Sequence, residues 1–270
     1  MGIKSEKSNN MNNKKALKKI DSWFEHYVAA FQSDNQAFNQ NIAIKVAHSR
    51  RVCDEMSALA ESLSLSPQER HLSQIIALLH DVGRFRQYAE YGTFADRKST
   101  NHATLGVTIL KENGVLDNFD NDIRSLILRT ITYHNRIDLP EGETDTCLFF
   151  VKMLRDADKI DIWHVVTSYY DRADTQRNRS IELDLPDTME VSPPVLEDIL
   201  SGRVVKVGNM KTLNDFKLLQ MSWVYDINFP YTFTVINKRK YLEKLRDAIT
   251  DKPRARAIYA ILRSYFERCL

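Results

Sequence analysis

The 270-residue chain contains little glycine, proline or cysteine, with 8, 7 and 3 residues of each. So few Gly and Pro residues are typical of a mostly helical globular protein and exclude a collagen-like or low-complexity chain. The three cysteines, Cys53, Cys147 and Cys269, lie far apart, are odd in number and lack the spacing of a zinc finger. We therefore expect free thiols in a reducing compartment rather than a disulfide framework.

Long apolar runs and an excess of one charge are also missing. No run approaches the ~20 residues of a membrane span, and the basic start "MGIKSEKSNNMNNKK" is not followed by the apolar segment of a secretory signal. The 38 Lys and Arg against 36 Asp and Glu leave a formal charge of only +2. We expect a cytoplasmic protein that binds neither membranes nor nucleic-acid duplexes.

Apolar residues recur at three- and four-residue intervals along most of the chain, which predicts an all-α fold. Hydrophobic residues make up 43% of the chain, enough to fill a core without staples. Residues 1–14 are polar and are expected to form a flexible tail. Residues 15–175 should form a helical bundle, and residues 176–270 a helical extension packed on it. The segment "GRVVKVGNMKT" could hold a short β-hairpin.

Metal-capable side chains interrupt the apolar faces of five predicted helices. The most conspicuous interruption is "IIALLHDVGRF", in which an aliphatic run ends in His80 and Asp81, and Gly83 is expected to let the chain leave the helix. His80 and Asp81 either diverge by about 100° on one helix or stand where the helix ends. The other inward positions, read from helical spacing, are His48, His102, His134 and Asp158.

A lone histidine on an apolar face is usually a core residue whose ring nitrogens are hydrogen-bonded. A buried aspartate is harder to explain, because an ionised carboxylate without a partner costs several kcal/mol or shifts its pKa. So many inward His and Asp groups would destabilise the core unless a cation offsets the free-energy cost of burying them. Imidazole and carboxylate ligands suit Mn, Fe, Co, Ni, Zn or Mg. The sequence therefore predicts a centre for one or two divalent metal ions.

His48, then His80–Asp81, then Asp158 in "RDADKIDI" resemble the H…HD…D pattern of the HD-domain superfamily of metal-dependent phosphohydrolases. The resemblance covers about Lys45 to Val166 and implies an HD-domain helical bundle. "HDVGR" is similar to the family's HD-(I/V)-G-K, with Arg84 in place of lysine. The resemblance implies that these four residues are metal ligands, with Asp156 as the competing choice for the last one.

Family members with two metal ions add two histidines between the HD pair and the last aspartate. "NHATLG" and "TYHN" place His102 and His134 at similar positions. The chain lacks the Gly-Tyr-Pro segment of the cyclic-dinucleotide branch and has a single histidine where that branch has two in a row. The resemblance therefore argues against cyclic-dinucleotide hydrolysis.

The implied activity is hydrolysis of a phosphomonoester or phosphodiester in a small, nucleotide-like molecule by metal-activated water. Asp81, Arg84 and Lys98 are the predicted catalytic residues. The predicted substrate-binding residues are Arg84, Arg97, Lys98 and Asp161. Arg97 could equally belong to a solvated loop, and the aromatic residues of "YAEYGTF" could either stack on a base or seal the loop.

Two other functions fit the same residues. A six-ligand site could hold two irons and perform an oxygenase reaction with O₂, as in some HD relatives. Alternatively, the chain could be a non-catalytic nucleotide-sensing module that keeps its metal for stability. In each case the chain could assemble as a homo-oligomer.

Overall fold

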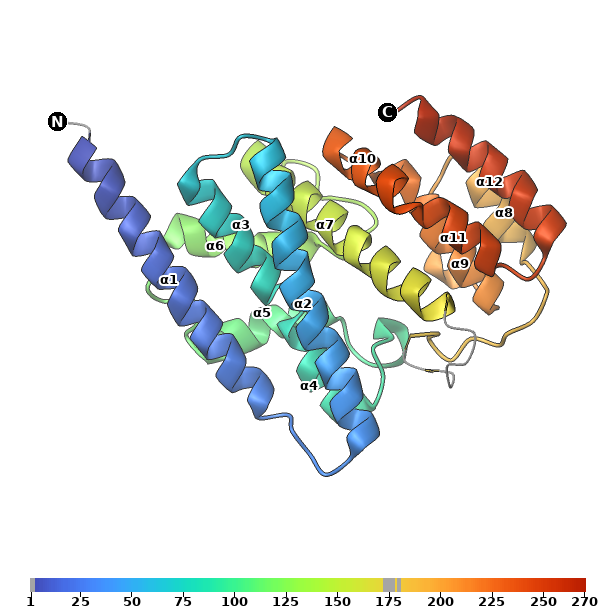
Figure 1. The fold of residues 1–270 in the computed structure, drawn as a ribbon. Helices are drawn as coiled ribbons and strands as arrows, with labels where there is room; N and C mark the ends of the chain where they lie inside the picture. The colour runs from blue at the N-terminus through green and yellow to red at the C-terminus, as the bar shows by residue number, and fades with distance from the viewer. Residues whose placement is uncertain (1–2, 172–177, 179–180) are drawn as a thin grey trace. The chain divides into compact units, whose positions relative to one another are not determined.

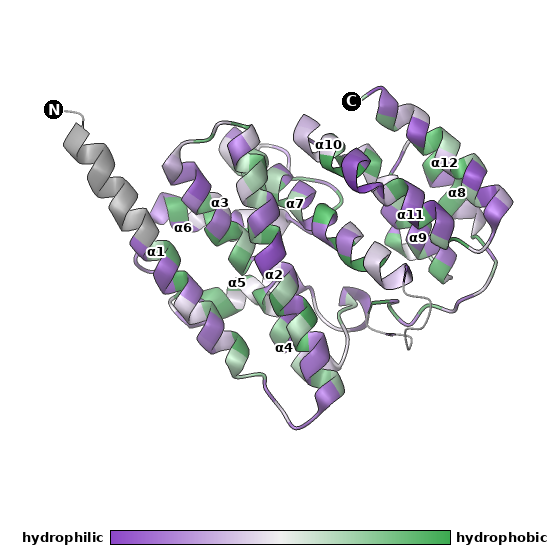
Figure 2. Cartoon of the chain, in the orientation of Figure 1, coloured by the Kyte–Doolittle hydropathy of each residue, from purple (hydrophilic) through white to green (hydrophobic). Residues whose placement is uncertain are grey.

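The computed structural model describes the backbone of residues 3–171, 178 and 181–270, and the side chains of this set from residue 15 onward. Contacts between residues divide the chain into two compact units, Met1–Asp158 and Lys159–Leu270. Within the described residues both units are helical and contain no β-strand, so the all-α prediction is confirmed (Figure 1). Hydrophobic and hydrophilic residues are interleaved along the coloured parts of the helices in Figure 2.

The first unit is built from six helices and the beginning of a seventh. Their bounds are α1 Ile3–Ala29, α2 Gln36–Ser62, α3 Pro67–Leu79, α4 Val82–Tyr91, α5 His102–Glu112, α6 Asn121–Tyr133 and α7 Asp145–Tyr170, and a short 3₁₀ helix, η1, spans Asp96–Lys98. Helix α3 packs against both α1 and α2. A reciprocal capping box between Ser66 and Glu69 starts α3, and Pro67 supplies its first residue.

The predicted apolar run of α3 is buried, and the chain changes direction directly after it. Ile75, Ile76 and Leu79 are almost fully inaccessible to solvent. His80 caps the C-terminus of α3, and Asp81, at φ −108° and ψ 15°, stands before the first residue of α4. The second of the two alternatives therefore holds: the His80–Asp81 pair lies at a junction between two helices rather than on one straight helix.

Gly83 does not end a helix, as the sequence suggested, but lies inside the first turn of α4. A Cβ atom at this position would stand 2.1 Å from the backbone oxygen of His102 and 2.7 Å from the backbone nitrogen of Gly106. Glycine is required here because α4 and α5 approach each other backbone to backbone. The left-handed residue that ends α4 is Gly92, at φ 64°.

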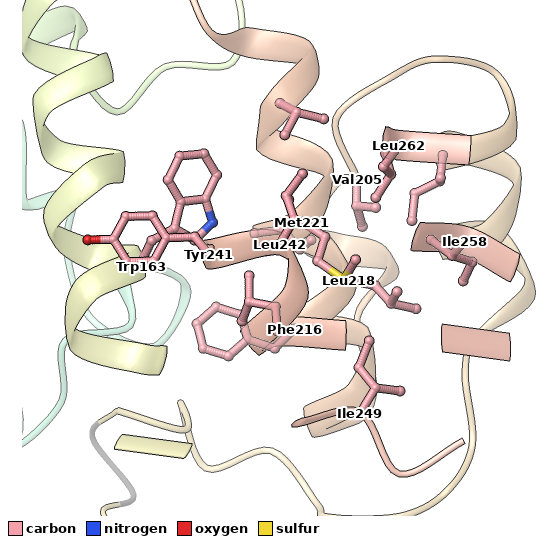
Figure 3. Packing of buried hydrophobic residues seen from close by; sticks show 14 of the residues in the cluster. Trp163, Val205, Phe216, Leu218, Met221, Tyr241, Leu242, Ile249, Ile258 and Leu262 are labelled. Carbon is pink, nitrogen blue, oxygen red and sulfur yellow. The ribbon is translucent and has the colours of Figure 1, made fainter. Parts of the chain in front are cut away.

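The second unit carries its own hydrophobic core (Figure 3). Its helices are α8 Pro193–Leu200, α9 Leu213–Ser222, α10 Pro230–Arg239, α11 Tyr241–Ala248 and α12 Lys252–Glu267, with 3₁₀ turns η2 Val207–Asn209 and η3 Trp223–Asp226. Trp163 stacks on Tyr241 with ring centroids 6.0 Å apart and donates its indole N–H to the carbonyl of Gln220. Every residue of α9 is buried, so this helix forms the centre of the unit.

The predicted β-hairpin in residues 202–212 is wrong. The backbone N–H of Val205 donates to Ser222 Oγ, and that of Lys206 donates to a carboxylate oxygen of Asp198. Residues 207–209 then form η2. Side chains of neighbouring helices therefore satisfy the donors that a second strand would have taken.

The domain boundaries proposed from the sequence stay predictions. The side chains of residues 1–14, the predicted flexible tail, lie outside the described part, although the backbone of α1 begins at Ile3. No helix in the described part of the chain is both long enough and apolar enough to cross a membrane.

The close approach at Gly83 predicts a specific loss of stability. Gly83→Ala should lower the free energy of unfolding by about 1–3 kcal/mol, because α4 and α5 must separate to accept the new methyl group. Urea denaturation followed by circular dichroism would measure the change. Gly208→Ala is the matched control, since a Cβ atom there would meet nothing within 4 Å. Equal stability of the two variants would contradict the argument.

Candidate metal centre

The six predicted metal ligands converge within the first unit. His48 comes from the middle of α2, His80 and Asp81 from the α3–α4 junction, His102 from the first residue of α5, His134 from the C-cap of α6, and Asp158 from α7. All are buried except Asp158, whose side chain is 20% exposed. Three overlapping groups of their ligand atoms each lie within 4.8 Å, which is the spacing that a shared cation requires.

The groups are His48, His80 and Asp81; His80, His134 and Asp158; and Asp81, His102 and His134. We term the first of these groups, together with Asp158, the first subsite. His48 Nε2 lies 3.1 Å from Asp158 Oδ1 and 3.5 Å from Asp81 Oδ2. His80 Nε2 lies 3.8 Å from Asp158 Oδ1 and 3.9 Å from Asp81 Oδ2. Two imidazoles and two carboxylates thus face a common point, with Asp158 rather than Asp156 as the second carboxylate.

The second subsite consists of Asp81, His102 and His134. His102 Nε2 lies 3.4 Å from Asp81 Oδ1, the oxygen that faces away from the first subsite. The Nε2 atoms of His102 and His134 lie 3.1 Å apart. Asp81 therefore presents one oxygen to each subsite, which is the arrangement of a carboxylate that bridges two ions.

The backbone fixes the tautomers of two of the histidines. Nδ1 of His80 lies 2.7 Å from the carbonyl of Ala77, and Nδ1 of His134 lies 2.6 Å from the carbonyl of Ile131. A carbonyl only accepts, so each Nδ1 must carry the proton and each Nε2 must present its lone pair. Both histidines stand at the end of a helix, where the carbonyl three residues earlier is free to accept.

The donor set fits a divalent cation. His80 Nε2 is buried and has no hydrogen-bond partner among the described residues. The facing Nε2 atoms of His102 and His134 would repel each other as two lone pairs, because the Nδ1 atoms of both rings are engaged with acceptors. A cation between these atoms would remove both penalties.

Electrostatics holds the ligands in their metal-binding protonation states. Burial lowers the pKa of His102 and of His134 to about 4, so both imidazoles are neutral near pH 7. Burial also lowers the pKa of His80. Burial alone would raise the pKa of Asp81, but Lys45, the histidines and Arg84 hold it well below its usual range. These three imidazoles are thus in the neutral form that binds a metal ion.

Asp96 is a neighbour of the candidate centre that the sequence reasoning missed. Its carboxylate lies 2.8 Å from His102 Nδ1 and also accepts from Arg84 at 2.8 Å, Gln87 at 2.9 Å and Asn135 at 3.2 Å. Such a carboxylate fixes the tautomer and ring orientation of a metal-ligating histidine. No sequence pattern marks it, because it stands six residues before His102 in the short 3₁₀ helix η1, which is too short to show a periodic pattern.

Lys45 was missed as well. Its Nζ atom donates to Asp81 Oδ2 at 2.9 Å. A signal did exist, because Lys45 precedes His48 by three residues and therefore emerges from the same face of α2.

The four other predicted site residues lie in three different environments. Arg84 is committed to carboxylates, with Nε 3.4 Å from Asp81 Oδ1 and Nη1 bonded to Asp96. Arg97 and Lys98 are exposed on η1, directly after Asp96. Asp161 is buried and belongs to the second unit. The roles proposed for these four residues in catalysis or substrate binding stay predictions.

Two of the three aromatic residues of "YAEYGTF" pack on each other, Tyr88 of α4 and Phe94 of the loop after it. The rings of Tyr88 and Phe94 stack with centroids 4.6 Å apart, and Phe38 of α2 lies 5.4 Å from Tyr88. The amide of Asn41 donates to the Tyr88 hydroxyl. For Tyr88 and Phe94 this geometry favours the interpretation in which the aromatic residues seal the loop against α2, whereas Tyr91 is exposed.

Residues 46–169 match the family model described as HD domain. The resemblance inferred from the histidines and aspartates is thereby confirmed. The family generally comprises metal-dependent hydrolases. Comparisons with curated proteins and with solved structures gave no match.

The two subsites predict the number of ions bound. The wild-type protein should bind two Mn²⁺ ions per chain, and His102→Ala should bind one, because the first subsite keeps all four of its ligands. Elemental analysis after equilibrium dialysis would count the ions. His26→Ala is the control, since His26 is exposed and, within the described part of the chain, bonds only to Ser22 of its own helix. Two ions in His102→Ala would contradict the assignment of the second subsite.

Asp96 should affect metal affinity without being a ligand. In Asp96→Asn the second subsite should bind its ion about 10–100-fold more weakly, because His102 loses the acceptor that orients its ring. Competition titration with a chromophoric chelator would measure both sites. Asp122→Asn, at an exposed position in the first turn of α6, should leave both affinities unchanged. Equal loss at both subsites would point instead to a general structural defect.

Proposed function

We propose that the chain is a metal-dependent phosphohydrolase that cleaves a phosphomonoester or phosphodiester of a small, nucleotide-like molecule. One observation carries this proposal: the two oxygens of Asp81 face two separate groups of histidines, at 3.5 Å from His48 and 3.4 Å from His102. The HD domain over residues 46–169 supports the hydrolytic class. The nucleotide-like substrate is inferred from the family resemblance.

A divalent ion in this centre would lower the pKa of coordinated water toward about 7 and neutralise charge on a phosphoryl oxygen. The four histidines and Asp158 would hold the ions, and Asp81 would bridge them. Asp96 keeps His102 in its ligating tautomer through the 2.8 Å hydrogen bond. Buried Ile75, Ile76 and Leu79 anchor the helix that ends at His80, so the centre is held without rearrangement.

Positive side chains are needed for the phosphoryl oxygens that the metal leaves uncovered. Arg97 and Lys98 are candidates, because they follow Asp96 in η1 and Asp96 contacts His102. Their backbone is therefore held next to the centre. Arg84 is better suited to positioning, since its guanidinium already bonds to the carbonyl of Phe94, to Gln87 and to Asp96. In this proposal Arg84 acts on the reaction by holding Asp81 and Asp96.

Turnover of phosphoesters tests the proposal directly. The purified protein, supplied in turn with Mn²⁺, Co²⁺, Ni²⁺ and Mg²⁺, should release phosphate or alcohol from members of a panel of nucleotide monoesters and diesters. Asp81→Ala should lower kcat/KM at least about 100-fold, a loss of about 2.7 kcal/mol of transition-state stabilisation. His26→Ala should retain full activity. The proposal fails if the metal-loaded wild type turns over no member of the panel.

A di-iron oxygenase is the second candidate, and the convergence of four imidazoles and two carboxylates favours it. It predicts an iron-dependent visible or EPR signal and oxygen consumption with a suitable organic substrate. A colourless protein that is active on phosphoesters with Mn²⁺ or Mg²⁺ would exclude it. The non-catalytic sensing module predicts instead that chelation lowers Tm while no phosphoester is turned over.

A further inference from the structure

Lys45 lies beside Asp81, the candidate bridging carboxylate, and is not itself a candidate metal ligand. Its Nζ atom lies 2.9 Å from Asp81 Oδ2, the oxygen that faces the first subsite. Its side chain is 17% exposed, against 4% for Asp81 and 5% for His48. The ammonium therefore stands at the solvent edge of the centre, where a substrate must arrive. Lys45 also lies one residue before the stretch that matches the HD family.

An aromatic ring holds the lysine in this place. Nζ lies 5.3 Å from the centroid of the Phe94 ring, which in turn stacks on Tyr88. Cation–π contact limits the range of the flexible lysine side chain and keeps its charge beside the metal ligands. Because Phe94 follows α4 and Lys45 comes from α2, the contact depends on the folded unit.

The two cations beside Asp81 are held differently. Besides its contact with Asp81 Oδ1, Arg84 bonds to Gln87, Asp96 and the carbonyl of Phe94. Lys45 has a single hydrogen-bond acceptor among the described residues, Asp81 Oδ2. An ion in the first subsite would take that same oxygen, which lies 3.5 Å from His48 Nε2 and 3.9 Å from His80 Nε2.

We propose that Lys45 is a substrate-binding residue whose ammonium, once a metal ion takes Asp81 Oδ2, bonds to a phosphoryl oxygen of the substrate. A partly buried ammonium that shares its acceptor with a divalent ion needs a second anion nearby. A metal-bound phosphoryl group carries such oxygens and reaches the centre from the solvent side. The three N–H donors of lysine can turn from the carboxylate to that oxygen without moving α2. The inference rests on the proposed phosphohydrolase function.

Inorganic phosphate, which is the product of phosphomonoester hydrolysis and carries the same phosphoryl oxygens as a diester product, is the probe for the test. Calorimetric titration of the Mn²⁺-loaded protein should show that Lys45→Met binds phosphate about 10–100-fold more weakly than the wild type, since a charge-assisted hydrogen bond is lost. Lys45→Arg should retain most of the affinity. Lys152→Met is the matched control, because Lys152 is an exposed lysine of α7. Elemental analysis should find wild-type metal content in all three variants.

The alternative role, positioning of Asp81, makes a different prediction. If Lys45 only held the carboxylate, Lys45→Met would lose metal, and the fraction still loaded would bind phosphate like the wild type. That result would overturn the inference, as would unchanged phosphate affinity in a fully loaded Lys45→Met. If the wild type itself binds no phosphate and cleaves no phosphoester, the proposed function fails and this inference fails with it. If the wild type binds phosphate and cleaves a phosphoester, the phosphate affinity of Lys45→Met tests the role of Lys45 without testing the proposed function.

Discussion

The structure of the first unit depends on one buried carboxylate, that of Asp81. The Asp81 side chain is 4% exposed, and its negative charge is offset by Lys45, by the surrounding histidines and by Arg84. An ionised group in this environment is tolerable only when every direction around it supplies a donor or a cation. The two oxygens serve opposite sides, Oδ2 toward His48 and Oδ1 toward His102. This division turns one side chain into the link between two possible metal sites.

Several features that are far apart in the sequence determine the position of the Asp81 carboxylate and of the histidines around it. The end of α3 at His80 exposes the carbonyl of Ala77, which orients His80, and the turn that follows places Asp81. Gly83 then allows α4 to approach α5 closely enough for His102 to reach Oδ1. The same logic recurs at the end of α6, where His134 bonds to the carbonyl of Ile131. Helix ends, with their unpaired carbonyls, therefore act as the orienting shell of the centre.

The candidate ligands were predictable because helical periodicity reports which residues face inward, and an inward His or Asp is costly unless it has a partner. Asp96 was not predictable, since its loop has no periodic pattern and its four hydrogen-bond partners come from α4, α5 and the segment after α6. The β-hairpin in residues 202–212 was predicted from β-branched residues alone. Side chains of Ser222 and Asp198 took its backbone donors, an outcome that depends on tertiary neighbours.

The sequence by itself determined the helical class, the inward faces and the identity of six side chains that can bind metal. It did so because these properties depend on residue type and on spacing along one helix. The tertiary structure decided that His80 and Asp81 occupy a junction, that Asp158 rather than Asp156 joins His48, and that Lys45 and Arg84 flank the two oxygens of Asp81. These facts concern distances between different helices. Such distances follow from how helices pack, as in the approach of α4 to α5 at Gly83, and helical periodicity carries no information about them.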